Sequence, residues 1–350
     1  MADFGGWEMP IEYPSSNGGG VINEHISVRE RAGLFDVSHL GKTEVRGKGA
    51  REFLNSILTN DLSKIAPGQA QYTMICDDDN GGVIDDLIVY LRSDDDLLLI
   101  PNAANNAEVI RRLQAAAPTG ISVTNAHDKF AVLALQGPLA REVLSALHLS
   151  HDLDYMSFTE VNYQGSPLVI CRTGYTGEFG FELLPRWENA LPIWKSLVKE
   201  VESRGGLIAG LGARDTLRTE MGYPLHGHEL SLDITPVQAN ASWAVGWQKV
   251  DFWGARILRD EREKGARRIL RALVLEERGI PRAEMVVLDL NGASSGIVTS
   301  GTFSPTLKKG IALALIDPRL KVGDRVSIDI RGRATSATIT KAPLVPSRVR

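Results

Sequence analysis

Two adjacent carboxylates interrupt an apolar stretch of the sequence. Asp85 and Asp86 lie within residues 81–90, GGVIDDLIVY, where the remaining side chains after the two glycines are β-branched, aliphatic or aromatic. This composition predicts a β-strand that is entered through a tight turn. Because side chains alternate along a strand, each face carries one carboxylate. The alternation places Asp85 with Val83, Leu87 and Val89, and Asp86 with Ile84, Ile88 and Tyr90.

A carboxylate on a strand with two apolar faces loses hydration, so it must be hydrogen-bonded, paired with a cation or functional. We expect Asp85 to cap the adjacent turn. Asp86 lies one residue deeper in the strand, and it is our candidate catalytic residue.

Glu182 presents the same problem on a second predicted strand, residues 181–184. It follows the loop TGYTGEFG, residues 173–180, which contains three glycines and Tyr175. Glycines allow a backbone to approach a ligand closely, so the loop and Glu182 form a candidate binding site. The alternative is that the loop is a plain hairpin connection.

Two arginines share one face of a helix that is predicted to begin in GLGARDTLR, residues 210–218. Arg214 and Arg218 are one helical turn apart, so they could receive an anionic ligand or pair with Asp215 and Glu220. The segment is not a dinucleotide-binding fingerprint, because Asp215 replaces the third glycine of GxGxxG.

Histidine is a candidate acid, base or metal ligand wherever it occurs. His39 stands near Ser38 and Asp36, but the spacing matches no catalytic triad, and a structural hydrogen-bonding role is favoured. His226 and His228 have no third ligand nearby in the sequence, so they are weak support for a metal site.

Composition limits the classes of function. Lys and Arg total 39 against 43 Asp and Glu, and the net charge of -4 argues against recognition of nucleic acid by bulk electrostatics. Cys76 and Cys171 have neither metal-ligand nor redox spacing, so we expect buried free thiols. No apolar segment is long enough to cross a membrane, and the start has no signal-peptide pattern. We predict a cytoplasmic protein without a membrane partner.

Hydrophobic periodicity indicates the elements that must position these residues. Apolar side chains between residues 50 and 58 recur on one face of a helix. Strands are predicted at 71–76, 83–91, 97–101 and 121–125, with a helix at 104–115. This order suggests a ferredoxin-like α+β unit with a hairpin closed by residues 77–82. A one-residue register decides whether Tyr72 shares a face with Asp86, and the sequence leaves it open.

Further elements are predicted on both sides of this unit. Helices are expected at 23–31, 187–203 and 252–264, and strands at 130–136, 168–172 and 181–184. The tail then has about six short strands separated by turn signals, as in a small barrel or sandwich. These strands are predicted at 269–275, 285–288, 295–300, 310–316, 325–330 and 334–339.

Nine blocks of the sequence resemble, in order, the T-protein family of the glycine cleavage system, the aminomethyltransferases. The blocks are FGGWEMP (4–10), GLFDVSHLG (33–41), LTNDL (58–62), GGVIDDLIVY (81–90), NAAN (102–105), ALQGP (134–138), RTGYTGE (172–178), GLGARDTLR (210–218) and SGTFSPTL (300–307). Together they extend over nearly the whole chain.

The resemblance implies an α+β fold with three domains in a cloverleaf around a channel that holds tetrahydrofolate. It implies antiparallel sheets, a ferredoxin-like unit and a C-terminal small β-barrel or jelly-roll-like domain. The first domain would combine residues 1–44 and 127–209, the second, with the folate site, residues 45–126 and 210–265, and the third residues 266–350.

The resemblance also implies a reaction. The aminomethyl group arrives on the reduced lipoyl arm of the H-protein, ammonia leaves, and the carbon becomes 5,10-methylenetetrahydrofolate. Asp86 matches the family's catalytic Asp, and it would stabilise the cationic carbon, orient the attacking folate nitrogen or relay a proton. No nucleophilic Ser or Cys and no metal is needed. Other glycine cleavage components are further expected partners.

The same match assigns the binding residues. Glu182 would accept the adjacent N–H donors on one edge of the pterin. Arg214 would attract the anionic glutamate tail of folate, and Asn102 would add a polar contact. The aromatic walls of the pocket would come from Tyr72, Tyr90, Tyr175 and Tyr223.

The sequence departs from the family pattern in three places. Phe179 and Glu229 stand where the family often has Asp, and the chain starts almost on the FGGW block. Two alternatives use the same scaffold. One is a folate-dependent demethylase or methyltransferase with another donor, which often joins a flavin domain that this chain has no room for. The other is a non-catalytic folate-binding assembly factor for iron–sulfur proteins, whose Lys-Gly-Cys motif is absent here.

Overall fold

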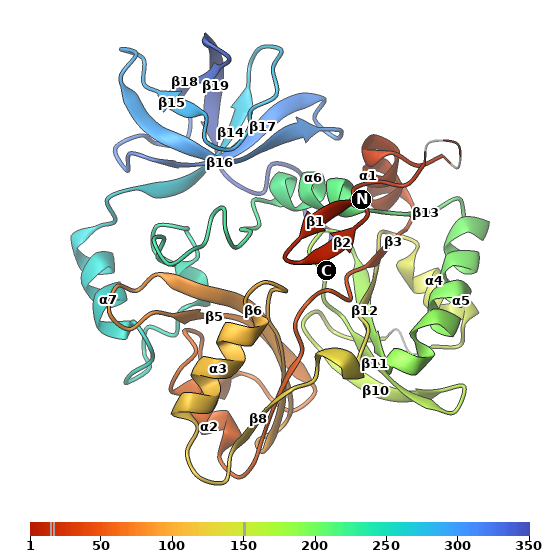
Figure 1. The fold of residues 1–350 in the computed structure, drawn as a ribbon. Helices are drawn as coiled ribbons and strands as arrows, with labels where there is room; N and C mark the ends of the chain where they lie inside the picture. The colour runs from red at the N-terminus through yellow and green to blue at the C-terminus, as the bar shows by residue number, and fades with distance from the viewer. Residues whose placement is uncertain (15, 17, 150–151) are drawn as a thin grey trace.

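Three lobes meet around the centre of the molecule (Figure 1). The computed structural model describes residues 1–350 except 15, 17, 150 and 151. A five-stranded sheet, a six-stranded sheet and a closed six-stranded barrel form the lobes. Between them lie α1 (Val21–Glu30), α6 (Leu211–Met221) and a hairpin of β1 (Ala2–Phe4) and β2 (Trp7–Met9). Both chain termini lie near this centre (Figure 1).

The five-stranded sheet carries Asp85 and Asp86. Its order is β5-β6-β7-β4-β8, and every pairing is antiparallel. The strands are β4 (Thr43–Arg46), β5 (Gln69–Cys76), β6 (Val83–Ser93), β7 (Asp96–Ile100) and β8 (Ser122–Asn125). One apolar core packs α2 (Ala50–Asn55), η2 (Leu62–Lys64) and α3 (Asn106–Ala116) on one face of this sheet.

The predicted order of elements in this lobe and its hairpin are confirmed. A four-stranded ferredoxin-like unit has parallel central strands. Here β7 lies between β6 and β4, so the strand that would pair parallel with β4 is displaced by one position. The extra strand therefore makes the whole sheet antiparallel.

The alternation predicted for β6 fails at one residue. The register pairs Ile75 with Asp85 but Cys76 with Val83, so Ile84 is an extra residue in a β-bulge. Because of the bulge, Ile84 packs in the core beneath α2 and α3. Val83 packs on the other face, with Cys76. The predicted faces of Val83 and Ile84 are therefore wrong, whereas the alternation from Asp85 onward is confirmed.

The second lobe supplies the wall opposite β6. Its sheet has the order β10-β11-β12-β9-β3-β13, with β13 parallel to β3 and the other pairs antiparallel. The strands are β3 (Gly33–Asp36), β9 (Leu133–Gln136), β10 (Phe158–Tyr163), β11 (Ser166–Cys171), β12 (Gly180–Pro185) and β13 (Leu207–Ile208). Helices α4 (Ala140–Ala146) and α5 (Ala190–Ser203) pack in one core with this sheet. Short 3-10 helices η3 (His127–Lys129) and η4 (Trp187–Asn189) complete the lobe.

The third lobe is the predicted barrel, closed in the order β14-β17-β16-β15-β18-β19. Its strands are β14 (Ile269–Leu275), β15 (Val286–Leu288), β16 (Ser294–Ser304), β17 (Lys309–Ile316), β18 (Arg325–Ile330) and β19 (Arg333–Thr340). A segment with η5 (Ser242–Ala244) and α7 (Ala255–Lys264) leads into it from α6. The expected domain division remains a prediction, and its boundary between residues 44 and 45 falls inside β4.

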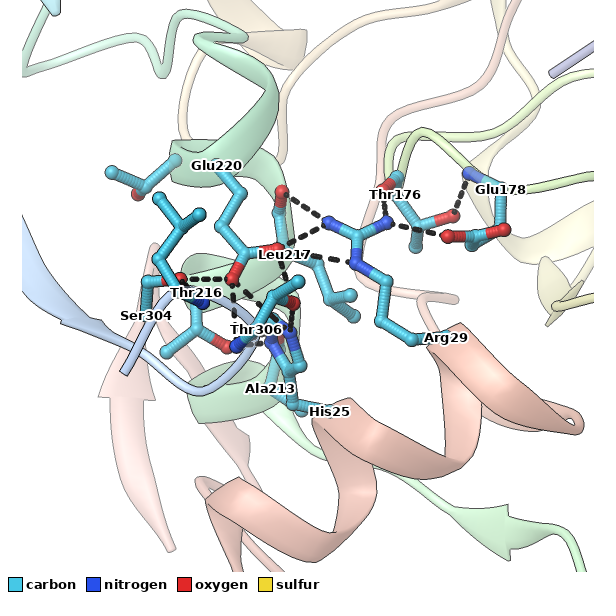
Figure 2. Close-up of polar contacts among 12 residues, drawn as sticks. His25, Arg29, Thr176, Glu178, Ala213, Thr216, Leu217, Glu220, Ser304 and Thr306 are labelled. Carbon is cyan, nitrogen blue, oxygen red and sulfur yellow. Dashed lines mark hydrogen bonds and ion pairs between the residues drawn. The ribbon is translucent and has the colours of Figure 1, made fainter. Parts of the chain in front are cut away.

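A buried ion network joins the six-stranded-sheet lobe to the barrel through α1 and α6 (Figure 2). Arg29 of α1 donates to Glu220 Oε2 at 2.7 Å and to Glu178 Oε1, in the loop before β12, at 2.9 Å. From the barrel, the Ser304 hydroxyl donates to Glu220 Oε1. Burial alone would raise the pKa of Glu220, but the hydrogen bond with His25 and the charge of Arg29 lower it to about 2. Glu220 is therefore ionised at neutral pH and holds α1, α6, the barrel and the 173–180 loop together.

The turn at Gly82 positions β6 against the 231–234 segment. A Cβ on Gly82 would lie 1.8 Å from the carbonyl oxygen of Leu232. Val83 N donates to the carbonyls of Ser231 and Ile234 at 2.7 and 3.1 Å. We expect Gly82→Ala to lower the free energy of unfolding by on the order of 3 kcal/mol, measured by urea denaturation, because the backbone contact must open.

Gly165→Ala is the control for this prediction. Gly165 has a φ of 86° and no heavy atom within 4 Å of its ideal Cβ. Alanine there adds only left-handed backbone strain, which costs about 1 kcal/mol. Equal losses for the two variants would contradict the steric explanation for Gly82.

Candidate active site

One cavity of about 210 Å³ collects all eight residues that the sequence singled out as a site. They are Tyr72, Asp86, Tyr90, Asn102, Tyr175, Glu182, Arg214 and Tyr223. They come from β5, β6, the turn after β7, the 173–180 loop, β12, α6 and the loop after α6. The structure brings the whole set together, while the role of each residue remains a prediction.

Asp86 faces this cavity with two hydrogen-bond donors fixed to its carboxylate. Tyr72 Oη donates to Asp86 Oδ2 at 3.0 Å, and Asn102 Nδ2 donates to Asp86 Oδ1 at 2.8 Å. The register pairs Tyr72 with Ile88, so Tyr72 is diagonally opposite Asp86 on the same face of the hairpin. This answers the question of register that the sequence left open.

Asp85 points to the other face and is fully buried. Its carboxylate accepts hydrogen bonds from the side chains of Asn102 and Asn105 at 2.8 and 2.7 Å, and from the Asn102 backbone at 3.0 Å. The expectation that Asp85 caps the turn at residues 77–82 is wrong. The strand directs it toward the end of β7, where it holds the turn that begins α3. Asp85 thereby fixes Asn102, which in turn holds Asp86.

Asp85 and Asp86 are both buried and lie close enough for their charges to interact. Burial, followed by the charge of Asp86, raises the pKa of Asp85 to about 8, although the asparagine hydrogen bonds oppose the shift. Burial also raises the pKa of Asp86, against the effects of the Tyr72 hydrogen bond and the nearby His226. Because two adjacent buried carboxylates repel, the pair takes up protons at higher pH than exposed aspartates do.

Glu182 lies on the opposite wall, and one of its carboxylate oxygens already accepts hydrogen bonds from the protein. Thr173 Oγ1 donates to Glu182 Oε2 at 2.5 Å, and Tyr90 Oη donates to the same atom at 3.4 Å. Oε1 has no hydrogen-bond partner among the residues that the structure describes. The 173–180 loop does connect the antiparallel strands β11 and β12, as the hairpin alternative held. It also lines the cavity through Tyr175.

Arg214 presents to the cavity a positive charge that has no direct ion-pair partner among the described residues, although the charge of Glu182 acts on it across the cavity. Its guanidinium lies 4.6 Å from the ring centroid of Tyr175. The Tyr175 hydroxyl donates to the carbonyl of Pro224, and the rings of Tyr175 and Tyr223 are 5.7 Å apart. No described residue pairs a carboxylate with Arg214, and burial lowers the pKa of this guanidinium. An anionic group in the cavity would therefore be attracted to it.

Arg218, one turn further along α6, is neutralised instead. Its guanidinium is buried and bonds to Asp215 at 2.6 Å, Glu229 at 2.9 Å and Ser300 at 2.7 Å. The expected pairing with Asp215 is confirmed. The expected pairing with Glu220 is wrong, because Glu220 faces α1 and the ion network there. Only Arg214 of the two is available to a ligand.

His39 also lines the cavity but makes no hydrogen bond through its buried Nδ1 within the described part of the chain. The ring of Phe4 meets it edge to face at 5.4 Å. Burial and the charges of Arg214 and Lys42 lower its pKa to about 3, so the imidazole is neutral. The structural hydrogen-bonding role favoured from the sequence is therefore wrong, since the surroundings are apolar and cationic.

Trp243 is a cavity residue that the sequence did not indicate. It stacks on Tyr72 with ring centroids 5.2 Å apart and planes inclined by 25°, yet 68% of it is exposed. Trp243 therefore lies where the cavity meets solvent, beside the Tyr72–Asp86 hydrogen bond. It belongs to the short helix η5, in a segment without apolar periodicity, so no sequence pattern distinguishes it.

The other chemistry-bearing residues have structural partners. His226 Nε2 contacts the carbonyl of Val83 at 3.1 Å, and His228 Nδ1 contacts that of Thr299 at 2.8 Å. No cluster of three metal-ligating side chains occurs in the described part of the chain. The two cysteines are buried free thiols, as expected.

Family models match the chain over both of its parts. The GCVT N-terminal domain matches residues 1–249, and the glycine cleavage T-protein C-terminal barrel domain matches residues 268–346. The chain belongs to the glycine cleavage T-protein family. The second match coincides with the closed barrel of β14 to β19.

Relatives support the same assignment. The chain is 57% identical over 349 residues to an aminomethyltransferase of Parafrankia sp. (strain EAN1pec), covering 100% of this chain and 94% of that protein. It is 53% identical over 352 residues to an aminomethyltransferase of Mycobacterium avium (strain 104), with the same coverage of 100% and 94%.

A solved relative has the same fold. The crystal structure of glycine cleavage system aminomethyltransferase T from Bartonella henselae matches with a TM-score of 0.91 at 34% identity, covering 99% of this chain and 94% of that one. The α+β class, the antiparallel sheets, the barrel and the transferase class expected from the sequence are confirmed. Among the described residues, no helix is both long and apolar enough to cross a membrane.

The raised pKa of Asp85 makes the free energy of unfolding depend on pH. A carboxyl with a higher pKa in the folded chain favours folding while protonated, and this contribution is lost as pH rises through the folded pKa, about 8 here. Asparagine cannot ionise. We expect Asp85→Asn to reduce the loss of unfolding free energy between about pH 5.5 and 8.5 by on the order of 1 kcal/mol per pH unit.

Urea denaturation across this pH range measures the effect. The fixed cost of the changed hydrogen bonds alters the height of the Asp85→Asn curve but not its slope. Asp79→Asn, in the exposed part of the turn, is the matched control and should keep the slope of the original protein. A common slope for all three proteins would show that Asp85 does not take up a proton in this range.

Proposed function

We propose that this chain moves the methylene carbon from the aminomethylated lipoyl arm of an H-protein to tetrahydrofolate and releases ammonia. The observation that carries the proposal is the single cavity in which Asp86, Glu182 and Arg214 face a shared space walled by tyrosines. Family membership supports the reaction class, because its members with 51–57% identity to this chain are aminomethyltransferases.

Glu182 is our candidate for recognition of the pterin. The free Oε1 and the remaining lone pair on Oε2 can accept two parallel N–H bonds from the pterin edge. Thr173 and Tyr90 hold the carboxylate from behind. Tyr175 and Tyr223 offer ring faces to the flat heterocycle, and Arg214 offers its charge to the folate carboxylates.

Asp86 is our candidate for the transfer step. As the bond from carbon to the departing ammonia breaks, the carbon that remains on sulfur gains positive charge. A folate nitrogen attacks this carbon, and ring closure by the second folate nitrogen releases the lipoyl thiol. The carboxylate of Asp86 stabilises the developing charge, and the donors from Tyr72 and Asn102 hold it in one orientation.

Replacement of Asp86 by asparagine separates binding from transfer. Asp86→Asn keeps the shape of the side chain but removes the charge that faces the reacting carbon. We expect the rate of ammonia release from aminomethyl-loaded H-protein to fall about 100-fold or more, with little change in the dissociation constant of tetrahydrofolate. Asp79→Asn should leave both unchanged. Full activity of the Asp86→Asn protein in this assay would rule out the catalytic assignment.

Replacement of Glu182 by glutamine tests the folate site. Glu182→Gln exchanges one acceptor for an N–H donor that would face the donors of the pterin. We expect tetrahydrofolate to bind at least about tenfold more weakly, measured by calorimetry. Glu188→Gln, the same change at an exposed position after the end of β12, is the matched control. An affinity that Glu182→Gln leaves unaltered would refute the assignment.

A further inference from the structure

A second pocket, of about 590 Å³, lies at the seam between the five-stranded and the six-stranded sheet. At this seam the backbone of Phe158 donates to the carbonyl of Gly68 at 2.8 Å. No residue that lines this seam pocket also lines the cavity with Asp86. The ring of Phe158, on the seam pocket, meets the ring of Tyr90, on the cavity, edge to face at 5.4 Å. The seam pocket is therefore a space of its own and not an extension of the folate site.

Arg92, near the end of β6, lines the seam pocket with unused hydrogen-bond donors. Its side chain is only 14% exposed, yet its guanidinium makes no hydrogen bond to a described residue. Nε lies 3.0 Å from Glu160 Oε1, but the direction of the N–H does not suit a hydrogen bond. Glu44 and Asp96 lie further away, 3.5 and 3.8 Å from Nη1. Because a nearly buried guanidinium needs acceptors for its N–H groups, this arrangement favours a further acceptor in the pocket.

Arg186, directly after β12, supplies a second guanidinium to the same pocket. It lies 4.6 Å from the ring centroid of Phe130, and the guanidinium of Arg92 lies 5.9 Å from the same centroid. The guanidinium of Arg186 has neither a carboxylate nor a hydrogen-bond partner in the part of the chain that the structure describes. Arg46, the third arginine of the pocket, is instead bonded to Asp96 at 3.2 Å. Two of the three arginines can therefore accept a ligand.

The charges that line the seam pocket do not balance, since three arginines face two carboxylates, Asp96 and Glu160. The side chain of Glu160 is 52% exposed and touches Arg92 without a hydrogen bond. An anion in the pocket could replace it, because the Glu160 carboxylate can turn into solvent. The apolar lining residues are Phe130, Phe158, Pro167 and Val169.

We propose that the seam pocket binds a phosphate monoester that carries a flat apolar group. A phosphate monoester has close to two negative charges and three acceptor oxygens near neutral pH, whereas a carboxylate has one charge and two oxygens. Two guanidinium groups beside one phenyl ring present more donors than one carboxylate accepts. The apolar lining fits the rest of such a ligand, and the pocket has the volume of a small-molecule site. This site goes beyond the proposed function, because neither tetrahydrofolate nor the aminomethylated lipoyl arm carries a phosphate.

Calorimetry of the whole chain with phenyl phosphate and with inorganic phosphate tests the proposal. We expect phenyl phosphate to bind about tenfold more tightly than inorganic phosphate, because its ring covers apolar lining. Arg186→Ala should weaken the binding of phenyl phosphate about tenfold, since charge-assisted hydrogen bonds are lost. Glu160→Gln should strengthen it about threefold, because the carboxylate that competes for Arg92 is removed.

Arg141→Ala is the matched control. Arg141 also lies over a phenylalanine ring, 5.1 Å from the centroid of Phe179, but it does not line the seam pocket. This variant should bind phenyl phosphate as the original protein does. Arg214→Ala, which removes the cation of the cavity with Asp86, should also leave this affinity unchanged.

Five outcomes would each overturn the proposal. Three concern the ligand and the pocket: no binding of phenyl phosphate, equal affinities for phenyl phosphate and inorganic phosphate, or an affinity that Arg186→Ala leaves unaltered. The fourth is an affinity that Glu160→Gln does not raise. The fifth is a loss in Arg141→Ala or Arg214→Ala as large as that in Arg186→Ala, which would place the ligand elsewhere.

Discussion

The structure depends on keeping two adjacent carboxylates inside a strand that is buried on both faces. An unpaired buried charge costs several kcal/mol, so each carboxylate needs its own donors. Asp85 obtains them from the turn that begins α3, and Asp86 obtains them from Tyr72 across the hairpin. Asn102 donates to both. The structural and the functional carboxylate are therefore coupled through one amide, and neither could be moved without disturbing the other.

The cavity is a gap between the inner faces of lobes that pack against one another elsewhere. Each sheet has one face covered by its own helices, while the other contributes to cores shared between lobes. The distance between Asp86 and Glu182 is thus set by packing between lobes and not within one. The ion network of Arg29 and Glu220 fixes the side of this cavity that carries Glu182, since it ties the 173–180 loop to α1, α6 and the barrel. We infer that this network holds the part of the cavity wall that contains Glu182 in place.

Sequence reasoning finds the residues whose surroundings follow from their own strand or helix. Asp86 and Glu182 stand out because apolar neighbours remove their hydration, and the helical repeat correctly puts Arg214 and Arg218 together. The sequence did not predict which residues each of these side chains contacts. The partners of Asp85 lie in the turn after β7, and a charge that neutralises Arg218 comes from another loop. The bulge at Ile84 exchanges the faces on which Val83 and Ile84 lie, and nothing in the composition of the strand indicates it. Trp243 has no pattern at all.

A buried polar group without a hydrogen-bond partner indicates a ligand site only where it also faces a cavity. Arg271 Nε is buried and unpaired within the described residues, yet it lies away from the cavity with Asp86. In that cavity, by contrast, Glu182 Oε1, His39 Nδ1 and the guanidinium of Arg214 all lack partners in the described structure. In the network of Arg29 and Glu220, by comparison, the arginine and both glutamates are ion-paired, although Glu178 Oε2 is buried without a hydrogen-bond partner among the described residues. An acceptor, a neutral imidazole and a cation therefore face one space with aromatic walls. A ligand with N–H donors, a flat ring and carboxylates would satisfy these groups.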